Sequence, residues 1–148
     1  MFPLAARAAA VPQAALCSGP IFVFATFLAE LYLRLPHPVA LPPIGVVPPA
    51  ILSSLLMLGF SAIVSAIVAL IPVLVGATAM MGLSARFQPA RLPLAWALAG
   101  AACGAAIAWA LDAGPSISFG IFAASSGSAW IVRLRLWNAE LEAELFGR

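Results

Sequence analysis

Glu30 is the residue whose type and position point most directly to chemistry. It lies near the end of an apolar segment, and an ionisable side chain within a membrane span is costly to insert and often functional. A carboxyl group facing the interior of a helix bundle could take up and release a proton, as a proton-coupled carrier requires. Arg34 follows four residues later on the same helical face, so the two side chains could instead form an interfacial ion pair that reaches water. We expect the ion pair and keep the proton-carrying carboxyl as the alternative.

Metal binding and cysteine chemistry are not indicated. His37 and Asp112 could join Glu30 in a polar cluster, but no helical i, i+3 or i, i+4 spacing links the three residues. We expect His37 to lie in a solvent-facing loop and Asp112 to begin a turn. Cys17 and Cys103 have apolar neighbours and no second ligand at metal spacing, so each is interpreted as a small buried hydrophobic residue.

The last apolar segment is unusually rich in serine. A nucleophile elbow needs a serine on a strand-to-helix turn with a base nearby, and Ser126-Gly127 has neither. We expect these hydroxyl groups to bond to carbonyl groups of the preceding turn or of a neighbouring helix, with a polar pathway as the alternative. The serines concerned are Ser116, Ser118, Ser125, Ser126 and Ser128. The sequence therefore predicts no enzyme and no cofactor.

Small residues recur at a spacing of four in three segments. This spacing places them on one face of a helix, where they let two backbones approach closely, and this is how helices associate in lipid. The predicted helix-packing residues are Ser61 and Ser65, Gly100 and Gly104, and Gly120, Ala124 and Ser128. We expect these faces to pack within the bundle, with contacts to another subunit as the alternative.

The composition places these residues in a membrane. Of the 148 residues, 64% are hydrophobic and 8% are charged, against about 45–50% and about 25% in a soluble domain. A globule of this size could not bury so much apolar surface, so lipid is the expected solvent. The net charge of +2 gives no reason to expect nucleic acid as a partner.

The expected fold is an all-α membrane protein, a single-domain bundle of about four transmembrane helices. The predicted spans are about 14–33, 50–83, 92–111 and 116–136, with a proline-rich outer connector at 36–49 and a helical tail at 137–148. The first span is expected to be an uncleaved anchor, because Pro12 and Gln13 interrupt the apolar run that a signal peptide needs.

The second predicted span is too long for one perpendicular crossing. Its residues would extend about 50 Å as a helix, against a hydrocarbon core of about 30 Å. We favour one long helix that is kinked near Pro72. A tilted helix with a frayed start, or two helices broken at Pro72, are the alternatives.

Arginine placement predicts the orientation. All seven basic residues are arginines, and an N-terminus in the cytoplasm leaves only Arg34 on the outer side. The six cytoplasmic arginines would be Arg7, Arg86, Arg91, Arg133, Arg135 and Arg148. Both termini are therefore expected in the cytoplasm, and the Arg- and Ala-rich composition favours a bacterial plasma membrane.

The leading functional hypothesis is a non-enzymatic structural or accessory subunit of a membrane complex. Its partners would be the lipid bilayer and other membrane protein subunits, or further copies of itself. The alternative is a small oligomeric transporter or channel that uses Glu30. An intramembrane enzyme is the least favoured class, because no nucleophile–base pair is found.

Overall fold

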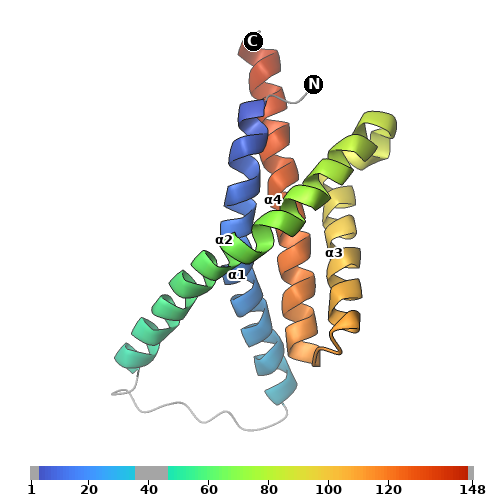
Figure 1. Cartoon of the computed structure of the whole chain (residues 1–148). Helices are drawn as coiled ribbons and strands as arrows, with labels where there is room; N and C mark the ends of the chain where they lie inside the picture. Colours follow the sequence, from blue (N-terminus) through green and yellow to red (C-terminus); the bar gives the residue numbers. More distant parts are fainter. Residues whose placement is uncertain (1–3, 36–46, 147–148) are drawn as a thin grey trace.

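The computed structural model describes residues 4–35 and 47–146, and in these ranges the regular structure is entirely helical. Helix α1 (Leu4–Arg34) is followed by α2 (Val47–Arg86), a short 3-10 helix η2 (Gln88–Arg91), α3 (Pro93–Ala110) and α4 (Pro115–Phe146). The long helices alternate in direction. The start of α1, the η2 turn and the end of α4 therefore share one end of the molecule, called here the terminal end (Figure 1). The opposite end, where α3 turns into α4, is called the Asp112 end.

Each of the four long helices contains a segment that is long and apolar enough to cross a membrane. These segments are Ala9–Arg34, Ala66–Arg86, Pro93–Ala110 and Pro115–Glu142. The predicted all-helical architecture with four such helices is therefore confirmed.

The helices extend beyond the predicted spans. α1 begins ten residues before the predicted start at residue 14, because Ala10, Val11 and Ala14 are buried in the core and this packing extends the helix through Pro12. α4 continues without a break through the predicted tail to Phe146. Residues 47–49, assigned to the connector from the sequence, form the start of α2, where proline is tolerated because the first N–H groups have no helical partner. The rest of the connector, 36–46 with His37, lies outside the described residues.

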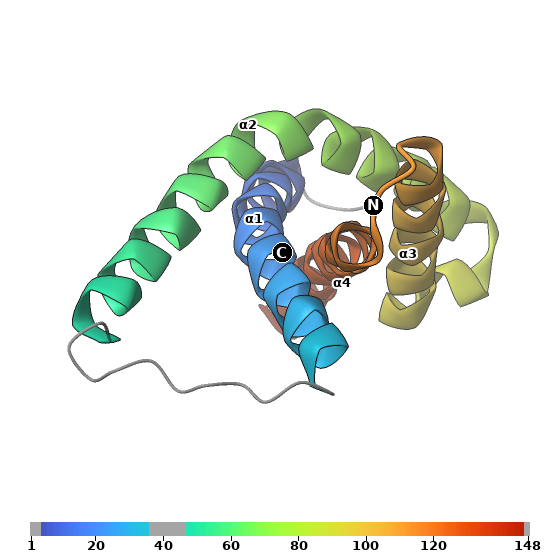
Figure 2. The same cartoon turned by 90° about the horizontal axis from the view of Figure 1, so that it is seen from below.

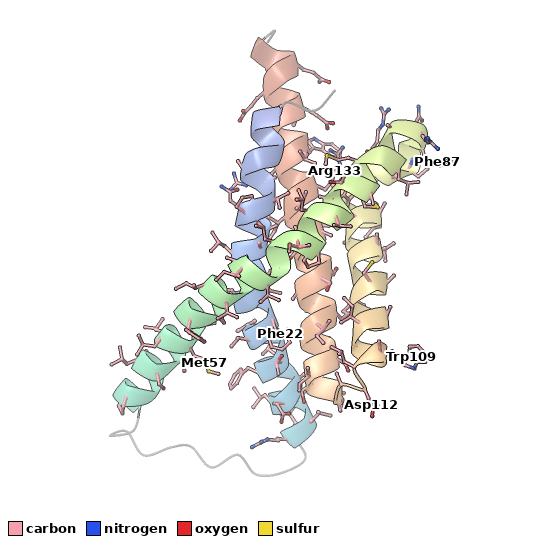
Figure 3. The ribbon with its side chains drawn as sticks, viewed as in Figure 1. Phe22, Met57, Phe87, Trp109, Asp112 and Arg133 are labelled. Carbon is pink, nitrogen blue, oxygen red and sulfur yellow. The ribbon has the colours of Figure 1, made fainter. Side chains whose placement is uncertain are left out.

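α2 is one continuous helix of 40 residues with Pro72 inside it, so the alternative of two helices broken at Pro72 is wrong. The kink at Pro72 stays a prediction. Only one stripe of α2 is buried or half-buried, and most of its other described side chains are exposed. The stripe is formed by Leu58, Ser61, Ala62, Ala66, Ala69, Val73, Ala77, Met80, Met81 and Ser84. The turns before Leu58 extend away from the other helices, as Met57 illustrates (Figure 3).

α4 is the central helix of the bundle. α1 and α3 each make their most extensive contacts with α4, whereas α2 packs mainly against α1 and touches α4 lightly. Figure 2 shows α2 laid across the side of α1. The core lies toward the terminal end, where Trp96, Val132 and Leu136 are almost fully buried against small residues of α1 and α2.

The turn from α3 to α4 is closed by backbone hydrogen bonds. The amide of Ala113 donates to the carbonyl of Ala108 at 3.0 Å, and the amide of Asp112 donates to the carbonyl of Trp109 at 3.1 Å. This is the Schellman pattern, which needs a left-handed residue after the helix. Asp112 takes that conformation with φ 47°, and aspartate tolerates it better than most residues. Pro115 then begins α4 where its missing N–H leaves no bond unmade.

Candidate functional site

Glu30 joins α1 to the first turn of α4 at the Asp112 end. The buried hydroxyl group of Ser116 donates a hydrogen bond to Glu30 Oε1 at 2.5 Å. Arg34 Nε lies 3.5 Å from Glu30 Oε2, and the Glu30 and Arg34 side chains are 47% and 76% exposed within the chain. The carboxylate thus has one partner on its own helix and one on α4, and nearly half of its surface is open to solvent or headgroups.

A second polar group lies one turn deeper along the same interface. The hydroxyl oxygen of Thr26 is buried and has no hydrogen-bond partner among the described residues. It lies against Gly120 of α4, where an added Cβ would collide with it. Because Thr26 and Glu30 are four residues apart on α1, and Gly120 and Ser116 four apart on α4, the two contacts are consecutive steps of one antiparallel interface. A buried hydroxyl group without a hydrogen-bond partner is uncommon in folded proteins. Thr26 thus adds a second polar group to the α1–α4 interface, one helical turn from Glu30.

The contact between Glu30 and Ser116 should be measurable as a coupling. Glu30→Ala, Ser116→Ala and the double variant form a double-mutant cycle, from which we expect a coupling free energy of about 0.5–1 kcal/mol in the folded protein. Water can replace part of the bond at the half-exposed carboxylate, which keeps the value small. The measurement is equilibrium unfolding in detergent micelles. The same cycle with Ser118→Ala should give no coupling, because the Ser118 hydroxyl donates to Ala113 instead.

The glycines of α3 lie where α3 meets α4. At Gly100, an added Cβ would collide with the carbonyl oxygen of Ser125, and at Gly104 it would lie 3.0 Å from the carbonyl oxygen of Ile121. The backbones of α3 and α4 therefore approach closely at both positions. By contrast, Gly76 in α2 has open space around it.

The other predicted packing residues are distributed over three places. Ser128 on α4 is buried, donates to Ala124 of its own helix at 2.7 Å and lies 3.5 Å from the carbonyl oxygen of Ala14 on α1. Ala124 is half-buried. Ser61 in α2 is half-buried and donates to the carbonyl of Leu58 at 2.8 Å, and the side chain of Ser65 lies outside the described part of the chain.

A second polar cluster, at the terminal end, surrounds Arg133 of α4 (Figure 3). Arg133 is 3% exposed. Its Nε donates to the carbonyl oxygen of Arg91 at 2.6 Å, and its Nη1 bonds to Glu140 Oε2 at 3.1 Å. Its guanidinium carbon lies 5.4 Å from the ring centroid of Trp137, within the range of a cation–π contact. Arg133 therefore ties the end of η2 to α4.

Two further bonds hold η2 in place. Arg91 Nε donates to the carbonyl of Ser84 at the end of α2, at 3.1 Å, and the buried Trp96 indole N–H donates to the carbonyl of Ala90 at 2.9 Å. The connection between α2 and α3 is thus fixed from three helices. Sequence reasoning counted Arg133 only as an orientation charge. The signal it missed is the spacing of seven between Arg133 and Glu140, which places both side chains on one face two turns apart.

The remaining features hold little chemistry. An open groove of about 600 Å³ at the Asp112 end is lined by Trp109, Asp112, Phe119 and Phe122, among others. Among the described residues, no three His, Cys, Asp or Glu side chains are grouped as metal ligands would be. Cys17 and Cys103 are free and exposed on the outside of the bundle, so the expectation that they are buried is wrong. The buried positions of α1 and α3 lie at other residues, such as Ala14 and Ser18 on α1 and Ala101 and Gly104 on α3.

Comparisons with protein families, with curated proteins and with solved structures give no match to the chain.

Proposed function

We propose that this chain is a non-enzymatic integral membrane protein that serves as a structural or accessory subunit of a membrane complex. The observation that carries the proposal is the incomplete packing of α2. In the apolar segment of α2 only 6% of residues are buried inside the chain, against 22–28% in the other three segments. Its small-residue positions Gly59, Gly76 and Gly82 also face open space.

The length of α2 strengthens this argument. Forty helical residues extend about 60 Å, twice the thickness of the hydrocarbon core. Every residue from Ile51 to Met57 is exposed, and five of these seven side chains are large and apolar. Lipid could solvate such a surface. The first turns of α2, however, add little packing that would stabilise the described chain, because they extend beyond its own bundle. A partner subunit lying along α2 would use that length.

The test is purification from native membranes in mild detergent, followed by sizing and mass spectrometry of the co-purifying chains. We expect a partner, or further copies of this chain, in fixed stoichiometry. Leu56→Ala with Phe60→Ala removes two exposed side chains one turn apart on α2 and should release the partner. Leu94→Ala with Leu98→Ala removes an equally exposed pair on α3 and should not. A solitary monomer in native membranes would exclude the proposal.

We also propose a bacterial plasma membrane location with both termini in the cytoplasm. The terminal end holds Arg86, Arg91, Arg133 and Arg135, whereas Arg34 lies at the Asp112 end, which supports this orientation by the positive-inside rule. Leu145→Cys and Leu111→Cys, each in a Cys17→Ser/Cys103→Ser background, test it with a membrane-impermeant thiol reagent on spheroplasts. Labelling of residue 111 alone is expected, and labelling of residue 145 alone would invert the orientation.

The second candidate function is a small oligomeric transporter or channel. It is favoured by two observations. The carboxyl group of Glu30 is bonded to Ser116 at the α1–α4 interface, and the buried Thr26 hydroxyl adds a second polar group to the same interface. The test is ion or proton flux in reconstituted vesicles. Flux that is lost in Glu30→Gln and kept in Asp112→Asn would support transport, whereas flux unchanged by Glu30→Gln would remove its only ionisable candidate.

A further inference from the structure

The end of α4 carries an apolar stripe that the rest of the described chain leaves partly uncovered. It is formed by Leu134, Trp137, Leu141 and Leu145, which are exposed by 40%, 38%, 45% and 78%. Val132 and Leu136, on the opposite face of the same turns, are almost fully buried against the bundle. The stripe is therefore only partly covered by this chain, since Trp137 and Leu141 line a shallow groove with Arg91 and Leu92. The end of α4 that carries it lies at the terminal end (Figure 1).

The candidate membrane-crossing segment of α4, Pro115–Glu142, has 28 residues, more than the about 20 that span the hydrocarbon core, so its last turns reach the headgroups. Glu140, Glu142 and Glu144 fall within five residues, and carboxylates at that density are costly inside a bilayer. The arginine cluster of Arg91 and Arg133 marks the level of the headgroups, and α4 continues 13 residues past Arg133, about 20 Å. Leu141 and Leu145 are thus apolar side chains in or next to water, where their exposure is unfavourable, unlike that of the lipid-facing residues.

Carboxylates border the stripe on both sides. At about 100° per residue, Trp137, Leu134 and Leu145 lie within about 40° of Leu141 around the helix, Glu144 lies about 60° to one side and Glu142 about 100° to the other. Both glutamates are exposed. An apolar seam flanked by charges of one sign is the pattern with which one helix selects another. Two exposed cations lie toward the bundle from this point. Arg91 of η2 lines one groove with Trp137, Leu141 and Glu144, and Arg135 of α4 is seven residues before Glu142, about 10 Å nearer to the bundle.

We infer that the stripe binds a basic amphipathic helix in the cytoplasmic part of a partner subunit, with an apolar seam flanked by Lys or Arg. A second copy of this chain is disfavoured, because copies inserted in one orientation point their tails the same way and would place Glu142 and Glu144 against the same carboxylates. An anionic membrane surface is disfavoured because its negative charge would repel Glu142 and Glu144. The inference rests on the proposed function, since it assigns the chemistry of the partner that the accessory role requires.

The test uses the full-length protein in zwitterionic lipid nanodiscs and two labelled synthetic helices. Both peptides carry the same apolar seam, one flanked by lysines and the other by glutamates, and binding is followed by fluorescence anisotropy. We expect the basic peptide to bind at least about tenfold more tightly than the acidic one. Glu142→Lys with Glu144→Lys should reverse the preference. Leu141→Ser with Leu145→Ser should abolish binding of both peptides, and Asp112→Asn, at the opposite end, should change nothing.

Equal binding of the two peptides, or a preference that survives the charge reversal, would overturn the inference. Spin labels on Leu145→Cys, in the cysteine-free background and without peptide, address the second copy. A short distance between two labels would show that the tail pairs with itself and would equally overturn the inference. The proposed function has its own readout. A stoichiometric partner that co-purifies with the chain while the peptides show no preference would refute only the tail site, whereas a solitary chain in native membranes would refute the accessory role.

Discussion

Arg133→Leu is expected to destabilise the bundle by about 2–3 kcal/mol. The substitution removes a guanidinium that is 3% exposed and leaves the carbonyl oxygen of Arg91 without its 2.6 Å donor. Losing a charge-assisted hydrogen bond costs about 1.5–3 kcal/mol, and the bond to Arg91 is part-buried. Glu140 is 39% exposed on its side chain, so water screens its ion pair with Arg133 and that pair adds little to the expected value.

The measurement is unfolding in detergent micelles followed by tryptophan fluorescence, because Trp96 and Trp137 lie in the same cluster. Arg133→Lys keeps the charge but not the forked geometry, and about half of the loss is expected. Arg135→Leu is the matched control, since Arg135 is exposed two positions along the same helix. Equal effects of the two leucine substitutions would show that the cluster is a surface charge only.

Gly100→Ala is expected to weaken the contact between α3 and α4 by about 1–3 kcal/mol. Its Cβ would meet the backbone carbonyl of Ser125 and the Cβ of Ala129, which lies 2.9 Å away. Neither neighbour is the end of a flexible side chain, so the two helices must separate. At Gly120 an added Cβ would instead meet the side chains of Thr26 and Phe22 on α1.

Gly76→Ala is the control for this prediction. Gly76 also lies inside a long helix, but nothing is within 4 Å of an added Cβ. Alanine favours helix over glycine, so we expect a gain of up to about 1 kcal/mol. Opposite signs for the two substitutions in thermal unfolding are the expected result. If Gly100→Ala also stabilised the protein, the close approach of α3 and α4 would be disproved.

The helices and their number could be predicted from the sequence, because hydrophobic length alone separates a span from a loop. Their ends could not. The start of α1 at Leu4 depends on burial of Ala10 and Ala14 against residues more than 100 positions away. α2 continues through Pro72 and packs mainly against α1, a contact that the local sequence does not show.

The candidate sites show the same difference between contacts within one helix and contacts between distant segments. The Glu30–Arg34 pair is a local i, i+4 relation and can be read from the chain. The Ser116 bond to Glu30 joins residues 86 positions apart, and only the antiparallel register of α1 and α4 brings them together. Arg133 looked like a surface charge because sequence alone does not show that η2 folds over it.

The central place of α4 also has a consequence for biogenesis. A ribosome delivers α1, α2 and α3 to the membrane before α4, yet α1 and α3 find their main packing surface on α4. Until the last 32 helical residues are inserted, the glycine face of α3 has no neighbour to meet. A chain that stalls or is cut short before Pro115 therefore keeps, among the extensive contacts of the described helices, only that between α1 and α2, and leaves α3 exposed to membrane proteases that recognise unpacked helices.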